Sequence, residues 1–307
     1  MRIHHALSRR ALLTAAAALA ASPALAQFNI PMGSGSVDVG KLFSGAKSLF
    51  DGFSLGEADE IKMGQAYYGG FVDRSGGPYR NRNAQAALAS FADPIIKTSK
   101  RPQLPWEFVL LDDDTVNAWA LPGGKLGINK GLIRYCDDPA DLAAVLSHEV
   151  GHAELSHAIS QMKNDSFTKG MTQVGREALN TKLSGAGGAV TNTVLDALQE
   201  PIYGMITSGY SQGSEFAADA HVLQVFETTG FAPAKASHFY GTLLQLVPPN
   251  STGTTSLFAT HPGTRERIAK LDALAKAKPA PATEAQAAGW AELKSVFPTR
   301  QVYRRTG

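Results

Sequence analysis

The sequence predicts a mainly helical α+β fold, and two observations support this prediction. Helical patterns fill most of the chain beyond residue 56, whereas strand-like patterns are confined to one stretch at 106–128. The composition, 44% hydrophobic and 18% charged over 307 residues, is that of a globular chain with ample material for a core. We therefore expect one folded domain over residues 57–275, in which helices surround a small β-sheet.

The first 26 residues have the pattern of a secretory signal peptide. A positively charged start precedes an Ala/Leu run at 11–21, and small residues stand before a cut ahead of Gln27. The Arg9-Arg10 pair resembles a twin-arginine export signal, with general secretion as the alternative. No cysteine stands at the cut, which leaves a lipoprotein anchor unsupported. We therefore expect export from a bacterial cytoplasm to the periplasm.

Charge and cysteine content narrow the function classes. The net charge of +2 becomes −1 once residues 1–26, which hold three arginines and no acid, are removed. A nearly neutral protein has no electrostatic attraction for nucleic acid, so no nucleic acid is expected as a partner. Cys136 is the single cysteine, which excludes an internal disulfide and a cysteine zinc cluster. We interpret it as a small buried hydrophobe.

Residues 27–56 are rich in glycine and serine and are predicted to form a flexible arm on the domain. A short amphipathic helix that touches a membrane surface or a partner is the alternative. Two helices should follow. The first spans 54–70, with acids at its start and Gly69-Gly70 at its end, and the second spans 83–98, where Pro94 kinks or splits it.

Three short strands are expected at 106–111, 116–121 and 125–128, separated by an Asp-rich turn and a Pro-Gly-Gly turn. A hairpin of this kind can expose the backbone groups of one strand at the edge of the sheet. An edge strand can hold an extended peptide by strand addition, although most hairpins only build a sheet.

A predicted helix from Pro139 to His157 carries the strongest motif in the chain. Asp138 is expected to cap it, and proline suits its first turn. His148 and His152 are four residues apart, so both rings lie on one face and can bind the same metal ion, while Glu149 can reach a water on that metal. This is the H-E-x-x-H arrangement of a zinc peptidase with Glu149 as general base. The alternative is a helix whose histidines only hydrogen-bond in the core.

The third ligand must come from elsewhere in the chain. On a continuous helix, His157 points about 140° away from His152, at about 100° per residue. Leu155 and Ala158 occupy the positions where the metzincin pattern requires glycine and histidine. His157 is therefore interpreted as structural.

Glu215 and Asp219 are candidates for the missing polar groups. They are four residues apart on a second predicted helix, which runs from Ser214 to about Thr229 among apolar residues. We expect Glu215 to complete a His2Glu set of ligands and Asp219 to hydrogen-bond a ligand histidine from behind. The alternative is that both are solvated charges on the helix surface.

The remaining stretches are less specific. Residues 160–213 are predicted to form helices with flexible joints over the site, or a plain structural insertion. His261 stands just before a helix that continues through Leu274, where it can stabilise an oxyanion or fill the vacant zinc position at rest. Residues 276–307 are predicted to be a linker and a C-terminal docking segment, with a small helix at 290–297.

Several separated motifs together resemble the Ste/HtpX/Oma/BepA-type zinc peptidases, metallopeptidase family forty-eight, which are gluzincin-like. The resemblance covers roughly residues 55–274 and keeps the order and spacing of the motifs. These motifs are Asn117-Ala118-Trp119-Ala120-Leu121-Pro122-Gly123-Gly124, His148-Glu149-Val150-Gly151-His152, Glu215 with Asp219, and His261-Pro262.

The resemblance implies a zincin-like metallopeptidase domain with one zinc ion (Zn²⁺) per chain. By that resemblance His148, His152 and Glu215 are the zinc ligands, Glu149 is catalytic, and His261 lies near the metal. It also implies that the edge strand lines the substrate cleft, with Asn117, Ala118, Trp119 and Ala120 as the substrate-binding residues.

The chain shows neither the transmembrane helices of the integral family members nor the C-terminal helical repeats of some exported members. It is therefore most similar to the small periplasmic members linked to envelope protein quality control. We expect a zinc-dependent endopeptidase whose substrates are unfolded or misassembled envelope proteins. The alternative is a chaperone or assembly factor that uses the peptidase fold mainly for binding. Hydrolysis of a non-peptide bond is a third, weaker interpretation.

Overall fold

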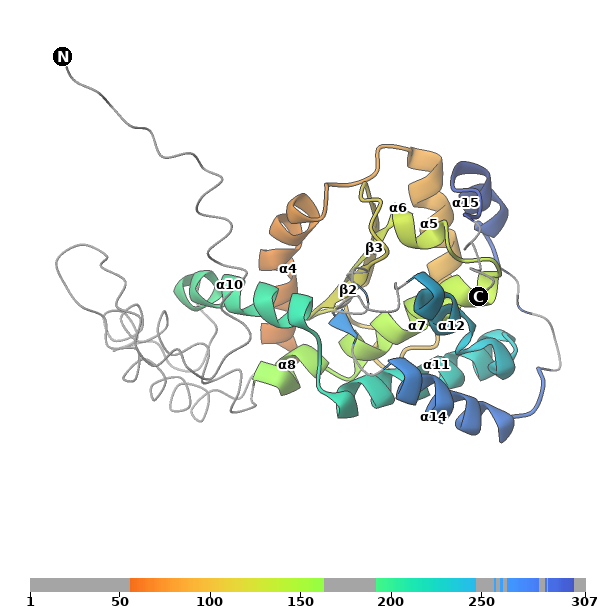
Figure 1. Cartoon of the computed structure of the whole chain (residues 1–307). Coiled ribbons are helices and arrows are strands. Elements are labelled where there is room, and N and C mark those ends of the chain that lie inside the picture. Colours follow the sequence, from red (N-terminus) through yellow and green to blue (C-terminus); the bar gives the residue numbers. More distant parts are fainter. Residues whose placement is uncertain are drawn as a thin grey trace, which may run out of the picture.

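The computed structural model describes residues 56–162, 192–246, 257, 260–261, 264–281, 285 and 287–300. The predicted signal peptide and all but the last residue of the predicted arm lie outside this part of the chain, as do residues 163–191 of the predicted insertion. Within the described part, helices enclose a three-stranded sheet, as the sequence predicts (Figure 1).

The elements keep the labels of Figure 1. They are α4 (Glu57–Arg74), α5 (Arg82–Ile96), β1 (Glu107–Leu111), β2 (Ala118–Leu121), β3 (Lys125–Asn129), α6 (Lys130–Ile133), α7 (Pro139–Glu154), α8 (His157–Met162), α10 (Asn192–Ser208), α11 (Gln212–Thr229), η1 (Pro233–Lys235), α12 (His238–Leu246), α14 (Thr264–Lys276) and α15 (Trp290–Val296). None of the helices in the described ranges is long and apolar enough to cross a membrane.

The sheet has the strand order β1-β3-β2, so β2 lies at an edge, as predicted. β3 pairs with β1 in parallel and with β2 in antiparallel register. Helices α5 and α7 pack on one face of the sheet, and α4 and α10 pack on the other. Because both faces are covered, every residue of β2 and β3 is buried.

The alternation of side chains along β2 divides the interior into two cores. Ala118 and Ala120 face the core formed with α5 and α7. Trp119 and Leu121 face the second core, formed with α4, α8 and α10. This is the two-residue period of a strand with both faces buried. β2 therefore lies between two separate hydrophobic cores.

α4 is longer than predicted, because it continues through Gly69-Gly70 to Arg74. A glycine inside a helix costs roughly 1 kcal/mol relative to alanine. The turn that follows buries Phe71 and Val72, and full burial of such a side chain contributes about 1.5–3 kcal/mol. Packing therefore outweighs the glycine signal. α5 likewise passes through Pro94 without being split.

The predicted C-terminal docking helix is present as α15, which packs on α5. Leu293 and Phe297 are fully buried. Gly289 caps the helix with φ of 78°, and a Cβ at this position would lie 2.1 Å from the carbonyl oxygen of Ala87. Only glycine allows this close approach of α15 to α5.

Candidate metal centre

α7 places the histidines and the glutamate of the motif in the centre of the domain. Its start follows the sequence prediction, since the Asp138 side chain accepts the N–H of Ala140 at 2.9 Å and Pro139 occupies the first turn. From Ala140 to its end, every residue of the helix is buried. The polar side chains of α7 must therefore be satisfied by other protein groups, by water or by a bound ion.

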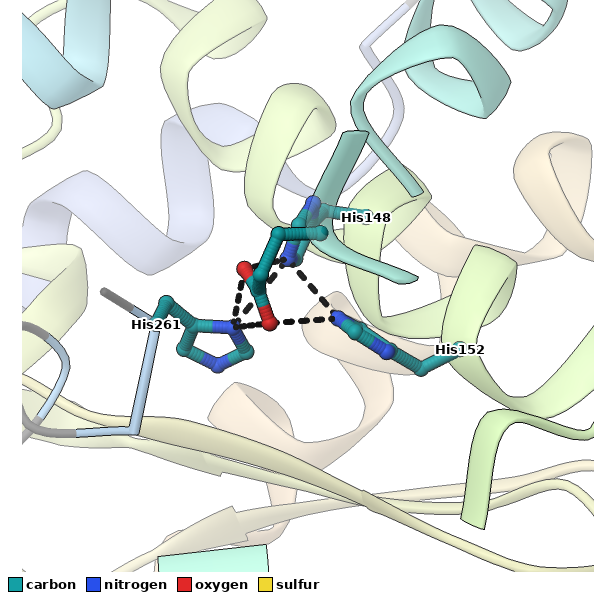
Figure 2. A group of neighbouring side chains, drawn as sticks. His148, His152 and His261 are labelled. Carbon is teal, nitrogen blue, oxygen red and sulfur yellow. Dashed lines mark hydrogen bonds and ion pairs between the residues drawn. The ribbon is translucent and has the colours of Figure 1, made fainter. Parts of the chain in front are cut away.

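Four side chains converge beside α7 (Figure 2). His148 and His152 come from α7, Glu215 comes from α11, and His261 lies just before α14. One ligand atom from each residue lies within 4.8 Å of the others, and all four residues are buried. The structure therefore brings together the three predicted ligands and also His261. We call these four residues the donor cluster.

The separations within the donor cluster suit a zinc ion. His148 Nε2 lies 3.0 Å from His152 Nε2 and 3.2 Å from His261 Nδ1. The Glu215 carboxylate oxygens lie 3.4 Å from His148 Nε2, 3.5 Å from His152 Nε2 and 3.1 Å from His261 Nδ1. Zinc–nitrogen bonds of ~2.0–2.1 Å in a tetrahedron place neighbouring ligand atoms about 3.3 Å apart. The donor cluster therefore fits a tetrahedral zinc ion.

Glu149 lies beside the donor cluster with its carboxylate unsatisfied. The residue is 1% exposed, and in the described part of the chain neither carboxylate oxygen has a hydrogen-bond partner. His261 Nε2 lies 3.3 Å from Oε1, close enough for an ion pair but without hydrogen-bond geometry. An unpartnered buried carboxylate is costly. A water molecule held next to it would satisfy it, and this is the arrangement of a general base.

A network of buried polar groups contacts the side chains of the donor cluster. Asp219 Oδ1 lies 3.1 Å from His148 Nδ1, the arrangement that the sequence predicts. Arg267 is 1% exposed and donates to both Asp219 oxygens, at 2.8 Å and 2.6 Å, and its Nη1 lies 2.7 Å from Glu215 Oε2. The Tyr240 hydroxyl donates to Asp219 Oδ1 at 3.0 Å. Arg267 thus contacts both Glu215, a predicted zinc ligand, and Asp219, which orients the ligand His148.

Arg267 and Tyr240 were not among the residues predicted from the sequence. One signal for Arg267 was available: it lies one helical turn before Leu271, on the same side of a helix that packs on α11. A cation on an apolar stripe needs a buried anion, and Glu215 and Asp219 were already candidates. Tyr240 comes from the short helix α12 and carried no comparable signal in the sequence.

The predicted geometry of His157 is wrong, although the residue lies outside the donor cluster as expected. α7 ends at Glu154, and Ser156 adopts a left-handed φ of 51°, so the helix does not continue to His157. The chain instead turns back, and His157 Nδ1 lies 2.9 Å from His152 Nδ1. His157 therefore contacts the ring nitrogen of His152 that faces away from the other donors. The ring of Tyr210 stacks on His152 with centroids 4.2 Å apart.

Burial and neighbouring charges shift the pKa values of the cluster. Burial tends to raise the pKa of Glu215, but His261 and His148 hold it well below its ordinary value. Burial, together with the charge of His148, lowers the pKa of His152 well below its ordinary value. Burial also opposes a charge on His261, yet Glu215 and Glu149 raise its pKa to about 10. Without metal, a cationic His261 lies between two carboxylates, so it must release a proton before Nδ1 can bind a metal.

The edge strand lies next to these groups, but most of its predicted substrate-binding side chains point into the cores. Ala118, Trp119 and Ala120 are buried, and Asn117 is partly buried. The Tyr210 hydroxyl donates to the Ala120 carbonyl at 3.4 Å. An extended peptide would therefore meet mainly the backbone groups of β2, which is the recognition mode of strand addition.

Comparison with known proteins agrees with this geometry. The family described as "Peptidase family M48" matches residues 82–275. The β-barrel assembly-enhancing protease of Escherichia coli (strain K12) is 28% identical over 223 residues, which cover 71% of this chain and 44% of that protein. The mitochondrial metalloendopeptidase OMA1 of Schizosaccharomyces pombe is 29% identical over 180 residues, covering 58% of this chain and 49% of that protein. The metalloprotease LoiP of Escherichia coli (strain K12) is 23% identical over 232 residues, which cover 76% of this chain and 86% of that protein.

The chain spans less than half the length of the β-barrel assembly-enhancing protease that it matches. The family match nevertheless covers more than half of the chain and includes every residue of the donor cluster. The resemblance inferred from the motifs is therefore confirmed, and with it the prediction of a zinc metallopeptidase domain. The donor set fits the zinc that this prediction requires.

Proposed function

This chain belongs to peptidase family M48, and we propose that it is a zinc-dependent endopeptidase of the bacterial periplasm that acts on extended segments of envelope proteins. The observation that carries this proposal is the donor cluster with Glu149 beside it. The cluster offers a zinc ion its ligands, and the carboxylate of Glu149 is buried next to it without a hydrogen-bond partner in the described part of the chain. Together they form the two halves of a hydrolytic site.

We propose that His148, His152 and Glu215 hold the zinc ion. A bound zinc ion supplies Lewis acidity, which polarises a peptide carbonyl and lowers the pKa of water. Asp219 and Arg267 would fix the orientation of these ligands, since Asp219 contacts His148 and Arg267 contacts Glu215.

Glu149 is the proposed general base. It would accept a proton from the attacking water and later donate it to the leaving amine of the cleaved peptide bond. Its burial at 1% exposure excludes bulk water from this proton transfer.

His261 has two proposed roles, and one measurement separates them. Its Nδ1 lies in the donor cluster, which supports a fourth donor at rest that is displaced when a substrate binds. The alternative is stabilisation of the developing oxyanion. A His261→Ala protein should lose zinc to a chelator faster than the native protein if His261 is the fourth donor. Unchanged zinc retention together with a lower kcat would support the oxyanion role instead.

The proposed substrates are unfolded or misassembled envelope proteins. β2 is an edge strand, and strand addition selects extended backbone, which a folded protein does not offer at most of its surface. The name of the β-barrel assembly-enhancing protease supports a role in envelope protein quality control. The proposed location rests on the signal peptide pattern of residues 1–26, with the twin-arginine route and a membrane contact of residues 28–56 as further proposals.

The proposal is tested by metal analysis of the mature protein together with a casein cleavage assay, with and without a chelator. We expect about one zinc ion per chain, cleavage of casein, and loss of both on chelation. A protein that holds zinc and cleaves neither casein nor short unstructured peptides would contradict the proposed activity.

The second candidate function is that of a chaperone or assembly factor that binds proteins through the peptidase fold. It is favoured by the buried side chains of β2, because these leave mainly backbone groups for binding at the edge. Rescue of an envelope defect separates the two functions. A Glu149→Gln protein that rescues a deletion as well as the native protein does would support the chaperone.

A further inference from the structure

A cavity of about 210 Å³ lies on the side of β2 that faces α4 and α10. It is larger than the ~150 Å³ engineered cavity that accommodates benzene, so it can hold a long side chain. Asn117 and Trp119, which alternate with the residues facing α7, line it. Thr260 also lines the cavity, while the next residue, His261, joins the donor cluster. The cavity is therefore adjacent to the proposed catalytic site.

Two charged side chains of the described residues line the cavity, Arg74 and Asp113, and Asp113 is the one without an ion-pair partner among those residues. Arg74 and Glu200 form an ion pair with two contacts. Of three consecutive aspartates, Asp112 pairs with Lys130 and Asp114 pairs with Arg134. The middle one, Asp113, lines the cavity and forms no ion pair with any residue that the structure describes. Within the described residues, its Oδ1 accepts the N–H of Thr115, at 2.7 Å.

A second acceptor in the cavity lining is also unsatisfied. Asn129 is 2% exposed and lies at the end of β3. Its Nδ2 donates to the Thr115 hydroxyl at 2.8 Å, whereas its Oδ1 is buried and has no hydrogen-bond partner within the described residues. A buried acceptor without a donor is costly. Because this oxygen is buried, it adds polarity to the wall and is not a contact point for a ligand.

Aromatic rings form the apolar part of the lining. The ring of Phe71 lies 5.5 Å from that of Trp119 and 5.0 Å from that of Tyr203, between centroids. Such walls suit an aliphatic stem or a planar guanidinium group. The cavity thus combines apolar walls with one charged acceptor, Asp113. The Arg74 guanidinium also lines it, paired with Glu200 and lying 4.5 Å from the centroid of the Tyr203 ring.

We propose that this cavity is a specificity subsite that takes a lysine or arginine side chain of the peptide held along β2. The proposal rests on the proposed function, because it places an extended substrate on the edge strand. A peptide side chain on the same side as Asn117 and Trp119 projects toward the cavity. Its stem packs against the aromatic rings, and its cationic end donates to the Asp113 carboxylate.

The experiment measures binding separately from cleavage. Zinc-loaded Glu149→Gln protein is titrated with labelled ten-residue peptides in which a single lysine is moved along a neutral sequence, with norleucine at the same positions in matched peptides. At one position we expect lysine to bind roughly tenfold tighter than norleucine, the gain of one hydrogen bond to a charged group. The gain should shrink with added salt, as expected for a partly exposed ion pair.

Three variants assign the gain to the cavity. Asp113→Asn keeps the acceptor for the Thr115 N–H and removes the charge, so it should abolish most of the lysine preference. Asp114→Asn is the matched control, because it removes an identical charge one residue away that does not line the cavity. It should keep the preference. Asp113→Lys should reverse it, so that glutamate binds better than lysine at the same position, and zinc content checks that each variant is folded.

The outcomes separate this subsite from the proposed activity. A lysine preference lost in Asp113→Asn and kept in Asp114→Asn supports the subsite even if the native protein cleaves none of the peptides. Equal binding of lysine and norleucine peptides, or an equal effect of the two aspartate substitutions, overturns the subsite. If the native protein also cleaves these peptides, the proposed activity stands while the subsite falls.

Discussion

The two sides of the edge strand differ in how their carboxylates are paired. On the side of α7, the carboxylates of Glu215 and Asp219 are matched by Arg267 and by the histidines of the donor cluster. On the side of α4 and α10, Asp113 and Asn129 Oδ1 keep unsatisfied capacity within the described structure. The protein itself supplies charged and hydrogen-bonding partners for carboxylates that must keep a fixed geometry for chemistry. A group that recognises a ligand instead keeps some of its charge or hydrogen-bonding capacity unpaired until the ligand binds.

The largest expected effect concerns Glu149, whose carboxylate has no hydrogen-bond partner in the described part of the chain. Glu149→Gln should lower kcat by about 10²–10⁴-fold, since the general base is lost. Zinc content should stay the same, because the donor cluster is intact. Retained proteolysis in the purified variant would contradict the assignment of Glu149.

The next largest effect should come from removing Arg267, the cation that pairs with Glu215 and Asp219 on the α7 side. Arg267→Met leaves the charges of Glu215 and Asp219 buried together, which should lower the free energy of unfolding of the zinc-free protein by about 3–5 kcal/mol. Arg265→Met is the matched control on the exposed part of the same helix, and it should change stability by less than about 0.5 kcal/mol. Urea titration of both proteins measures the difference, and similar losses would show that Arg267 is not a specific counterion.

Asp219→Asn tests how strictly the α7 side depends on one carboxylate. The amide keeps the shape but removes the charge that faces His148 and Arg267. Zinc affinity should fall by about 10–100-fold, the usual effect of losing a group that orients a ligand histidine. Competition with a fluorescent zinc chelator measures it. An unchanged affinity would mean that Arg267, rather than Asp219, fixes the orientation of His148.

The same change on the other side of β2 should have the smallest effect on stability. Asp113→Asn alters a partly exposed carboxylate that has no ion-pair partner in the described part of the chain, so the free energy of unfolding should change by less than about 0.5 kcal/mol. Urea titration of this variant beside Asp219→Asn compares the two sides directly. A loss above 1 kcal/mol would show that the charge of Asp113 has a stabilising partner in the folded protein.

Short patterns in the sequence, such as helix caps and residue spacings, predict the features whose formation depends on nearby residues. Asp138 and Pro139 mark the start of α7, and the four-residue spacings identify His148 with His152 and Glu215 with Asp219. The three strands also follow from apolar runs and turn residues, whereas the assignment of the Asn117 strand to the substrate cleft came from the resemblance to the family. These features depend on neighbours within a few residues, so the sequence displays them directly.

The features that the sequence analysis missed depend on contacts between distant segments. Whether α7 stops at Glu154 depends on Ser156, whose hydroxyl donates to Glu60 and accepts from Arg101, both far away in the chain. The continuation of α4 past Gly70 depends on burial of the next turn. The role of Arg267 depends on which carboxylates lie opposite its helix. None of these can be obtained from periodicity alone.

The long sequence separations within the donor cluster also set the order in which a newly made chain acquires it. His148 and His152 are paired as soon as α7 forms, but His148 and His261 are 113 residues apart. By the scaling of loop-closure entropy, a loop of that length costs roughly 4 kcal/mol to close, beyond a constant term. A chain that emerges with its N-terminus first would therefore display the motif long before it has the site. We expect the capture of zinc during refolding to coincide with the slowest change in tryptophan fluorescence, which makes the metal a reporter of completed folding.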